Sequence, residues 1–402
     1  MGARRRALFF AVCALAALVP ACHETTTEVV YVTGLILTPA DTAIRQGGSL
    51  QLRASLVDTA GHPVLDVPAA FASSDSSVAR VSASGFLTTR GPLGGVIVTA
   101  SYSRFEAAAF VRVFDSTLSA SLELSARPFG VAASAQNVVY VTRLDAAALA
   151  RIDLPRAAFS GSVPVGSVPT SVDFNPGGTT AYVANQFSGN VGVVNVATNT
   201  QAGALPVTGD PSVARVSPDG TLLWISTNAD SLYGVDLASN STAHRFGFPW
   251  LANGLAFHPT NDSLLYASVL DGTVREINFK RDTVLRTFTL GGRLQGIAVA
   301  PNAAELYVAN ENTWQLQVVS LSSGSVVDSV SLGGAPFDLQ LSPDKTKIWI
   351  SVMTTGQVKV FDRVTRALSR TIATQGTPRR IAFAASGTTV VANESGWVDL
   401  VK

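Results

Sequence analysis

The 42 residues from Pro169 to Asp210, PTSVDFNPGGTTAYVANQFSGNVGVVNVATNTQAGALPVTGD, are one copy of a pattern that recurs along the chain. Aligned copies begin at seven positions: Pro128, Pro169, Pro211, Ala252, Leu294, Pro336 and Pro378. Successive starts are therefore 41 or 42 residues apart. A fixed period in this range is typical of repeat architectures, in which each copy forms one supersecondary unit. The period therefore predicts the fold of everything after Pro128.

Each of the first six copies contains four short apolar runs separated by turn sequences, and the last copy contains three. In the third copy the turn Ser217–Gly220 (SPDG) follows the first run, and Pro, Asp and Gly favour such chain reversals. The second run carries the tetrapeptide Tyr182–Asn185 (YVAN), which returns as Tyr307–Asn310. Four strands of about five or six residues with four short loops account for the length of one copy. Each copy is therefore predicted to form one blade of a β-propeller.

The tetrapeptide resembles the signature of the YVTN family of β-propellers, and an altered version stands at Tyr140–Arg143. This resemblance implies a seven-bladed propeller. The last copy ends at Lys402 after only three strands, whereas residues 118–124 (LSASLEL) read as a strand before the first copy. We expect this segment to pair beside Trp397–Val401 and to remove an exposed sheet edge. The propeller would then span residues 116–402, closed by strand 118–124.

Residues 32–115 show a different pattern, with short alternating strands separated by turns such as Gln46–Gly48, which is typical of an antiparallel sandwich. The runs Leu37–Ala40, Phe71–Val81 and Gly85–Thr88 resemble the group 2 bacterial immunoglobulin-like (Big2) domains. A single copy in that family implies a spacer. The fold class predicted is all-β, an N-terminal Ig-like β-sandwich followed by a seven-bladed β-propeller.

Residues 1–21 have the features of a signal peptide, with Arg4–Arg6 followed by an apolar run too short to span a bilayer. The sequence Val19–Cys22 (VPAC) resembles a bacterial lipobox, which implies cleavage before Cys22 and lipid attachment to its thiol. Residues 22–31 would form the lipidated tether. The alternative is an ordinary signal peptide with an incidental Cys22. The resemblance predicts an exported lipoprotein anchored in the cell envelope through Cys22, facing the periplasm or the cell surface.

Composition limits the classes of partner. Charged residues make up 14% of the chain, against roughly 25% in an average domain. Loss of residues 1–21 would leave 26 basic against 28 acidic side chains. Such a chain has no general attraction for nucleic acid or anionic lipid, so a nucleic-acid partner is not expected. We expect a monomer that binds a protein, peptide or glycan.

Catalytic motifs are absent from the sequence. Four His residues are present, with no His-x-x-x-His pair, Cys cluster or Asp-rich calcium loop, and no Gly-x-Ser-x-Gly motif. No catalytic residue, metal ligand or cofactor is therefore predicted. Asp173 and Arg215 occupy equivalent positions in adjacent copies, and we expect them to pair near the channel. The sequence favours a non-catalytic protein without excluding an enzyme.

One face of the predicted propeller carries residues that do not repeat. In this fold the loops that enter the first strand and the loops that join the second and third strands share one face. Where the scaffold repeats but a position does not, the fold does not dictate the residue, and aromatic and Arg side chains are enriched in binding hot spots. The candidate binding face consists of Phe187, Trp250, Arg293, Trp314, Phe337, Arg379 and Trp397. The alternative is that these residues belong to ordinary solvated loops.

Three functions remain open from the sequence. The favoured one is a non-catalytic envelope lipoprotein in which the Ig-like domain is a spacer and the propeller face binds a partner. The second is an envelope enzyme of the lactonase or quinoprotein kind that uses the propeller channel. The third is a nucleic-acid-binding propeller, with Trp250, Trp314 and Trp397 as stacking platforms.

Overall fold

The computed structural model describes residues 31–229 and 231–402. Within these residues the protein is built from β-strands and three single-turn 3₁₀ helices: η1 (Leu144–Ala146), η2 (Gln186–Ser188) and η3 (Phe279–Arg281). None of the described helices is long and apolar enough to cross a membrane. The chain divides into two compact units, one ending at Ser116 and one beginning at Thr117. The predicted signal peptide and Cys22 lie outside the described residues.

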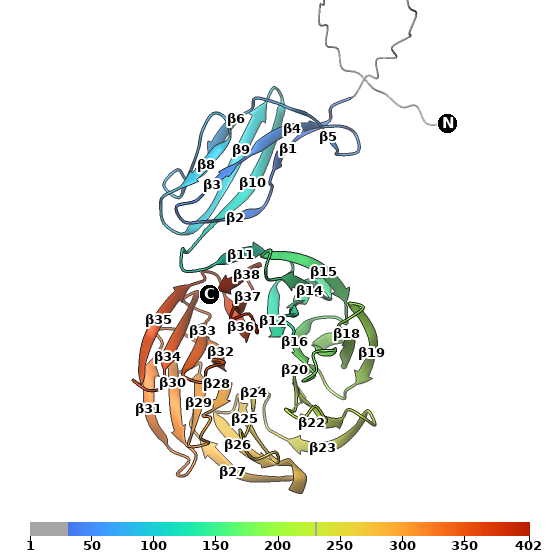
Figure 1. Cartoon of the computed structure of the whole chain (residues 1–402), viewed down its shortest axis with the longest axis vertical. Helices are drawn as coiled ribbons and strands as arrows, with labels where there is room; N and C mark the ends of the chain where they lie inside the picture. Colours follow the sequence, from blue (N-terminus) through green and yellow to red (C-terminus); the bar gives the residue numbers. More distant parts are fainter. Residues whose placement is uncertain (1–30, 230) are drawn as a thin grey trace, which may run out of the picture. The chain divides into compact units, whose positions relative to one another are not determined.

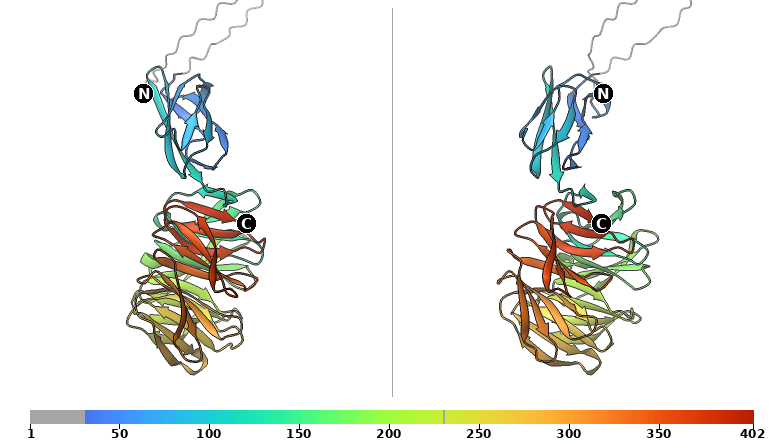
Figure 2. Two further views of the ribbon diagram at one scale, coloured as in Figure 1. Left: turned by 90° about the vertical axis from the view of Figure 1, so that its left-hand side faces the viewer. Right: turned by 60° about the vertical axis from the view of Figure 1, so that its left-hand side comes forward.

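The N-terminal unit is a β-sandwich of ten strands in three sheets (Figure 2). The first sheet has the order β1 (Gly34–Thr38), β4 (Arg53–Val57), β5 (Pro63–Asp66). The second has the order β2 (Thr42–Arg45), β10 (Phe105–Phe114), β9 (Gly94–Tyr102), β6 (Ala70–Ser73). The third has the order β3 (Ser49–Gln51), β8 (Phe86–Thr89), β7 (Ala79–Val81). Alternate residues of β9, namely Val96, Val98 and Ala100, are buried against the other sheets, as the period of two predicts.

The C-terminal unit contains seven four-stranded antiparallel sheets, the blades of a propeller (Figure 1). The innermost strands are β12 (Pro128–Ala133), β16 (Pro169–Phe174), β20 (Pro211–Val216), β24 (Ala252–Phe257), β28 (Leu294–Val299), β32 (Pro336–Leu341) and β36 (Pro378–Phe383). The second strands are β13 (Val139–Arg143), β17 (Thr180–Asn185), β21 (Leu222–Thr227), β25 (Leu264–Val269), β29 (Glu305–Asn310), β33 (Lys347–Val352) and β37 (Thr389–Asn393). All seven aligned starts of the repeat are first residues of innermost strands.

The outer half of each blade completes the antiparallel order. The third strands are β14 (Ala148–Asp153), β18 (Asn190–Asn195), β22 (Ser231–Asp236), β26 (Thr273–Asn278), β30 (Gln315–Ser320), β34 (Gln357–Asp362) and β38 (Trp397–Val401). The outermost strands of blades 1 to 6 are β15 (Ala158–Pro164), β19 (Thr200–Pro206), β23 (Ser241–Gly247), β27 (Thr283–Thr289), β31 (Val326–Ser331) and β35 (Ala367–Ala373). Neighbouring innermost strands contact one another around the axis, and β12 contacts β36.

Each blade is buried on both faces, which explains why the strands read as nearly continuous apolar runs. All six residues of β21 are buried. On one side, Leu223 and Ile225 join Tyr182 of blade 2 in a shared apolar cluster. On the other side, Trp224 joins a cluster that includes Leu255 of blade 4. Because adjacent blades share their cores in this way, no blade can bury its apolar area alone.

The ring closes through a strand from the beginning of the propeller. Strand β11 (Ala120–Glu123) is the outermost strand of blade 7, in the order β11-β38-β37-β36. It pairs antiparallel with β38, with Leu122 opposite Val398. The adjoining cluster combines Val131 of blade 1 with Val390 of blade 7. Blade 7 is therefore assembled from both ends of the propeller sequence, at the place where residues 118–124 were expected.

Closure can be tested with Leu122→Pro. Proline removes a strand N–H and is poorly tolerated within a sheet, so we expect β38 to lose protection at the closing blade. Hydrogen–deuterium exchange should show faster exchange of the amides in residues 397–401. Val330→Pro is the matched control, because Val330 lies opposite Leu316 in the outermost strand of blade 5. It should accelerate exchange in β30 and leave β38 protected. Unchanged exchange of β38 in Leu122→Pro would contradict the closure.

Candidate binding face and channel mouth

Every blade has an irregularity at the start of its innermost strand. In blade 6, Pro336 lies opposite Val352 and Leu339 lies opposite Ile350, so the two residues between them, Phe337 and Asp338, face a single residue of β33. The same register shift occurs in the other six blades. Bulges of this kind re-aim side chains next to functional sites. The innermost strands surround the channel, so their first residues lie at one end of it, which we call the channel mouth. The second and third residues of each innermost strand lie at this mouth.

At this mouth, blades 1, 6 and 7 contribute a cluster of aromatic and Arg side chains. The rings of Phe129 and Phe337 meet edge to face, with centroids 5.5 Å apart. The Arg379 guanidinium lies 4.7 Å from the Phe337 centroid and 5.3 Å from the Phe129 centroid. Guanidinium–aromatic contacts at this distance are attractive. We call Phe129, Phe337 and Arg379 the mouth cluster.

An acidic residue fixes the orientation of the mouth cluster. Arg379 Nε donates to Glu394 Oε2 at 2.6 Å, and Arg127 donates to Glu394 Oε1. Burial acts to raise the pKa of Glu394, but the hydrogen bonds and charges of Arg127 and Arg379 outweigh it and hold this pKa below its usual value. Glu394 is therefore ionised at neutral pH and bridges the two Arg side chains. The Arg379 guanidinium of the mouth cluster is therefore already paired within the protein.

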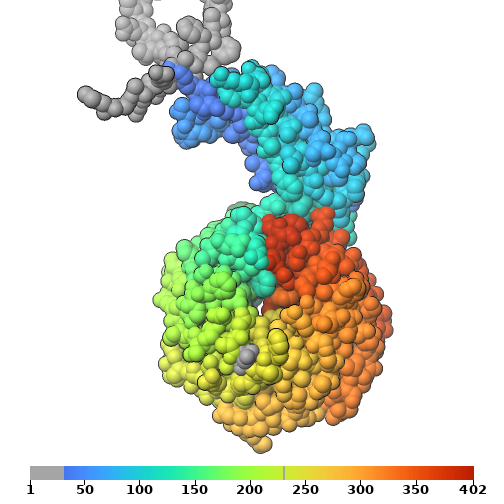
Figure 3. Space-filling view, turned by 180° about the vertical axis from the view of Figure 1, so that it is seen from behind, coloured from blue at the N-terminus to red at the C-terminus, as the bar shows by residue number. Residues whose placement is uncertain are grey.

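Three large aromatic side chains also lie on loops of the same face. Phe187 belongs to η2, Trp250 lies between β23 and β24, and Trp314 lies between β29 and β30. Their exposed fractions are 71%, 59% and 52%. Figure 3 shows this unit as a ring of blades around a narrow central hollow. Isolated exposed aromatics are common, so the case for a binding face needs a further observation.

The backbone at Trp314 supplies that observation. Its φ is +57°, in the left-handed region that costs a non-glycine residue roughly 1–2 kcal/mol. The residue just before the third strand has positive φ in each of the six blades where it is described. Four of these blades place Gly there: Gly189, Gly272, Gly356 and Gly396. Trp314 thus occupies a turn position that favours Gly, and its exposed ring gives little packing in return.

The structure separates the predicted face into exposed and buried members. Phe337 and Trp397 are only 8% and 9% exposed, so they offer little surface to a partner. Trp397 lies in β38, where its indole N–H donates to Thr374 O at 3.3 Å and to Asp399 Oδ2 at 3.1 Å. Arg293 is exposed beside Glu311, and its Nε lies 3.6 Å from Glu311 Oε2. The exposed part of the predicted face is therefore Phe187, Trp250, Arg293 and Trp314.

The expected pair at the channel is present. Arg215 Nε lies 3.7 Å from Asp173 Oδ2, an ion pair between blades 2 and 3. Sequence reasoning missed a second polar group. Arg380, in blade 7, reaches across the channel to Asn253 in blade 4, with its NH2 3.3 Å from Asn253 Oδ1. The sequence does make Arg380 unusual, because three other blades have Gly at the equivalent position. It does not identify Asn253 as the partner of Arg380, because the two residues belong to blades that are not adjacent.

The described part of the chain contains no metal-binding group of side chains, and two of its His residues have structural contacts. Within residues 31–229 and 231–402, no group of three or more His, Cys, Asp or Glu side chains could hold a metal ion. His258 Nδ1 accepts from the backbone N–H groups of Thr260 and Asn261 at 3.2 and 3.0 Å, which stabilises a turn. His244 stacks on Trp224, with ring centroids 5.8 Å apart. Both His residues support local structure.

Comparison with known proteins adds evidence on the fold. No protein-family profile and no curated protein sequence matches the chain. Many solved structures are similar to it, and one of them is hydrazine synthase from Kuenenia stuttgartiensis. That match has a TM-score of 0.64 at 16% identity and covers 71% of this chain and 98% of the other. At this identity the likeness concerns the fold alone.

Because Phe337 is buried and Phe187 is exposed, their substitution by Ala should change stability by very different amounts. Phe337→Ala should lower the free energy of unfolding by about 3–5 kcal/mol, because it leaves a cavity beneath Arg379. Phe187→Ala should change it by less than about 0.5 kcal/mol. Denaturant unfolding of the two variants and the parent measures both effects. A small effect of Phe337→Ala would contradict a packing role for the mouth cluster.

The strain at Trp314 makes a separate prediction. Trp314→Gly should stabilise the protein by up to about 1 kcal/mol, because Gly adopts the left-handed conformation without steric cost. Trp314→Ala removes the same ring but keeps a Cβ at positive φ, so it is the matched control and should not stabilise. The two midpoints of thermal unfolding give the comparison. A lower midpoint for Trp314→Gly than for Trp314→Ala would contradict the backbone strain at this position.

Proposed function

We propose that the protein is a non-catalytic cell-envelope lipoprotein whose propeller loop face binds a protein, peptide or glycan. Trp314 carries the proposal, because a half-exposed indole is kept at a backbone position where Gly would serve the fold better. Phe187 and Trp250 support it, since they place two more exposed rings on loops of the same face. Trp is strongly enriched in interface hot spots, and rigid aromatic side chains lose little entropy on binding.

The remaining parts of the proposal rest on the sequence. The lipobox-like residues at Cys22 support an anchor in the envelope, with the N-terminal β-sandwich as a spacer of the Big2 kind. The tetrapeptide at Tyr182–Asn185 supports membership of the YVTN propellers. The mouth cluster is already satisfied by Glu394, so the partner would contact the exposed aromatics and Arg293 first. Without residues 1–21 the chain would carry 26 basic against 28 acidic side chains, so it would have no general attraction for a polyanion.

Capture from envelope extracts tests the proposal. The bait is residues 23–402, beside a variant with Phe187, Trp250 and Trp314 changed to Ala. We expect a partner retained by the parent and lost by the triple variant. Val364→Ala is the control, because Val364 is 84% exposed but lies in a loop between the third and fourth strands, on the opposite face. It should capture the same partner as the parent.

The outcomes separate the partner classes. Loss of capture after protease treatment of the extract would indicate a protein or peptide, and loss after glycosidase treatment would indicate a glycan. Equal capture by the parent and the triple variant would overturn the proposed face. Capture that falls steeply with salt and disappears after nuclease treatment would instead support nucleic-acid binding.

A further inference from the structure

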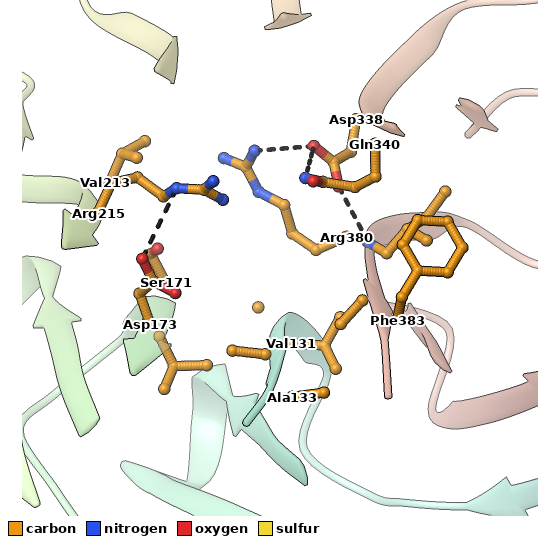
Figure 4. Close-up of a pocket in the computed structure, with 15 residues that line it drawn as sticks. Val131, Ala133, Ser171, Asp173, Val213, Arg215, Asp338, Gln340, Arg380 and Phe383 are labelled. Atoms are coloured by element: carbon orange, nitrogen blue, oxygen red, sulfur yellow. Dashed lines mark hydrogen bonds and ion pairs between the residues drawn. The ribbon is translucent and has the colours of Figure 1, made fainter. Parts of the chain in front are cut away.

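The channel of the propeller contains two Arg side chains that face one another. Figure 4 shows the guanidinium groups of Arg215, from blade 3, and Arg380, from blade 7, pointing toward each other across a cavity. The cavity has a volume of about 170 Å³ and is also lined by Asp173, Asp338 and Gln340. A polar cavity of this size can hold water or a small ion.

The hydrogen-bonding capacity of Arg215 is almost unused. Within the described residues no hydrogen bond from its guanidinium is present, and its buried Nε lacks a hydrogen-bond acceptor. Its ion-pair partner, Asp173, is beyond hydrogen-bond distance, at 3.7 Å. A guanidinium has five N–H donors, and a buried donor without an acceptor is unfavourable. Arg215 therefore has donors to offer to a molecule in the cavity.

Asp173 is engaged mainly by backbone groups, whereas Asp338 also accepts from Gln340 Nε2, at 3.3 Å from each of its carboxylate oxygens. The oxygens of Asp173 accept from Val216 N at 2.9 Å and Phe174 N at 3.0 Å. Burial raises the pKa of Asp173, even though Arg215 and these two N–H groups act to lower it. Asp338 Oδ2 accepts from Ile381 N at 2.9 Å. Neither carboxylate is therefore well placed to neutralise both guanidinium groups.

The contacts of Arg380 are long. Its NH1 lies 3.4 Å from Asp338 Oδ1, and its NH2 lies 3.4 Å from Asn253 O and 3.3 Å from Asn253 Oδ1. Its side chain is nonetheless mostly buried. Burial lowers the pKa of Arg380, and the nearby charges of Arg215 and Arg379 lower it further against the effect of Asp338. Water can accept from these donors and screen the repulsion, but it has no net charge with which to neutralise the two guanidinium groups.

From this arrangement we propose that the channel binds a small oxyanion, a carboxylate or phosphate group, between Arg215 and Arg380. The planar fork of each guanidinium matches two oxygens of such a group, and charge-assisted hydrogen bonds are the strongest of their kind. One anion placed between the forks would satisfy the donors of both side chains and relieve their repulsion. Neither the mouth cluster nor the exposed aromatic residues line this cavity, so the site is separate from the proposed partner surface.

The site can be tested with sodium phosphate and sodium malonate as probes. Titration calorimetry of the 23–402 protein, with sodium chloride at matched ionic strength as the blank, should show saturable binding of at least one probe. The same probe should raise the midpoint of thermal unfolding more than chloride does. The tighter of the two probes identifies which oxyanion geometry the site prefers. No saturable binding of either probe beyond the chloride blank would overturn the proposal.

Two substitutions with opposite expected effects locate the anion. Arg215→Gln should weaken binding by at least about tenfold, because it removes a charge-assisted contact. Asp173→Asn should tighten binding severalfold, because it removes the carboxylate that competes for Arg215. Arg245→Gln is the matched control, since the exposed Arg245 carries the same charge outside the channel, and it should bind like the parent.

Arg215→Gln is expected to fold, because it breaks no hydrogen bond, and its unfolding midpoint in chloride checks this. Equal affinity in Arg215→Gln and Arg245→Gln would overturn the proposal. Weaker binding in Asp173→Asn would overturn the placement of the anion beside Arg215. Capture by the loop-face aromatics should be the same with and without the anion, so failure of either proposal leaves the other testable.

Discussion

Closure of the ring is the constraint on which the propeller depends. Each blade has two apolar faces and can bury them only between two neighbours, so a linear stack would leave two faces in water. The cluster that joins Val131 to Val390 removes both of these faces at once. The pairing of β11 with β38 holds that junction by backbone hydrogen bonding between the two ends of the repeat. Blade 7 is built from both ends of the propeller sequence, and by closing the ring it keeps the apolar faces of the other six blades buried.

Closure of the ring also limits the size of the side chains that can occupy positions near the axis. Innermost strands approach one another so closely that a Cβ at Gly296 would lie 2.5 Å from Leu339 N, and one at Gly254 would lie 2.6 Å from Gln295 O. Small residues are needed at such points. Long side chains fit only where neighbouring blades leave space, and Arg215 and Arg380 extend into that space. The channel is therefore polar on some blades and lined by Gly and Ala on others.

The sequence predicted the repeating features well because each is set by local chemistry. The period located the first residue of all seven innermost strands, and the missing fourth strand of the last copy pointed to β11. Burial at the channel mouth was harder to predict. Phe337 packs against Phe129 of blade 1 and Arg379 of blade 7, whereas Trp397 lies opposite Glu123 of β11, a strand from the other end of the propeller sequence. The contact of Arg380 with Asn253 crosses between blades 7 and 4, and no local pattern encodes such a pair.

Two local features are expected to lower the free energy of unfolding of the propeller. Trp314 holds a left-handed backbone conformation that Gly adopts freely, and the guanidinium groups of Arg215 and Arg380 face one another in the channel. In a repeat fold the alternative residue is visible at the equivalent position of other blades, so neither feature is forced by the architecture. Locally unfavourable choices that the surrounding structure tolerates are characteristic of binding sites, where a ligand supplies the missing interaction. The exposed indole and the paired guanidinium groups are unfavourable for different physical reasons, which is why they are best explained by two different ligands.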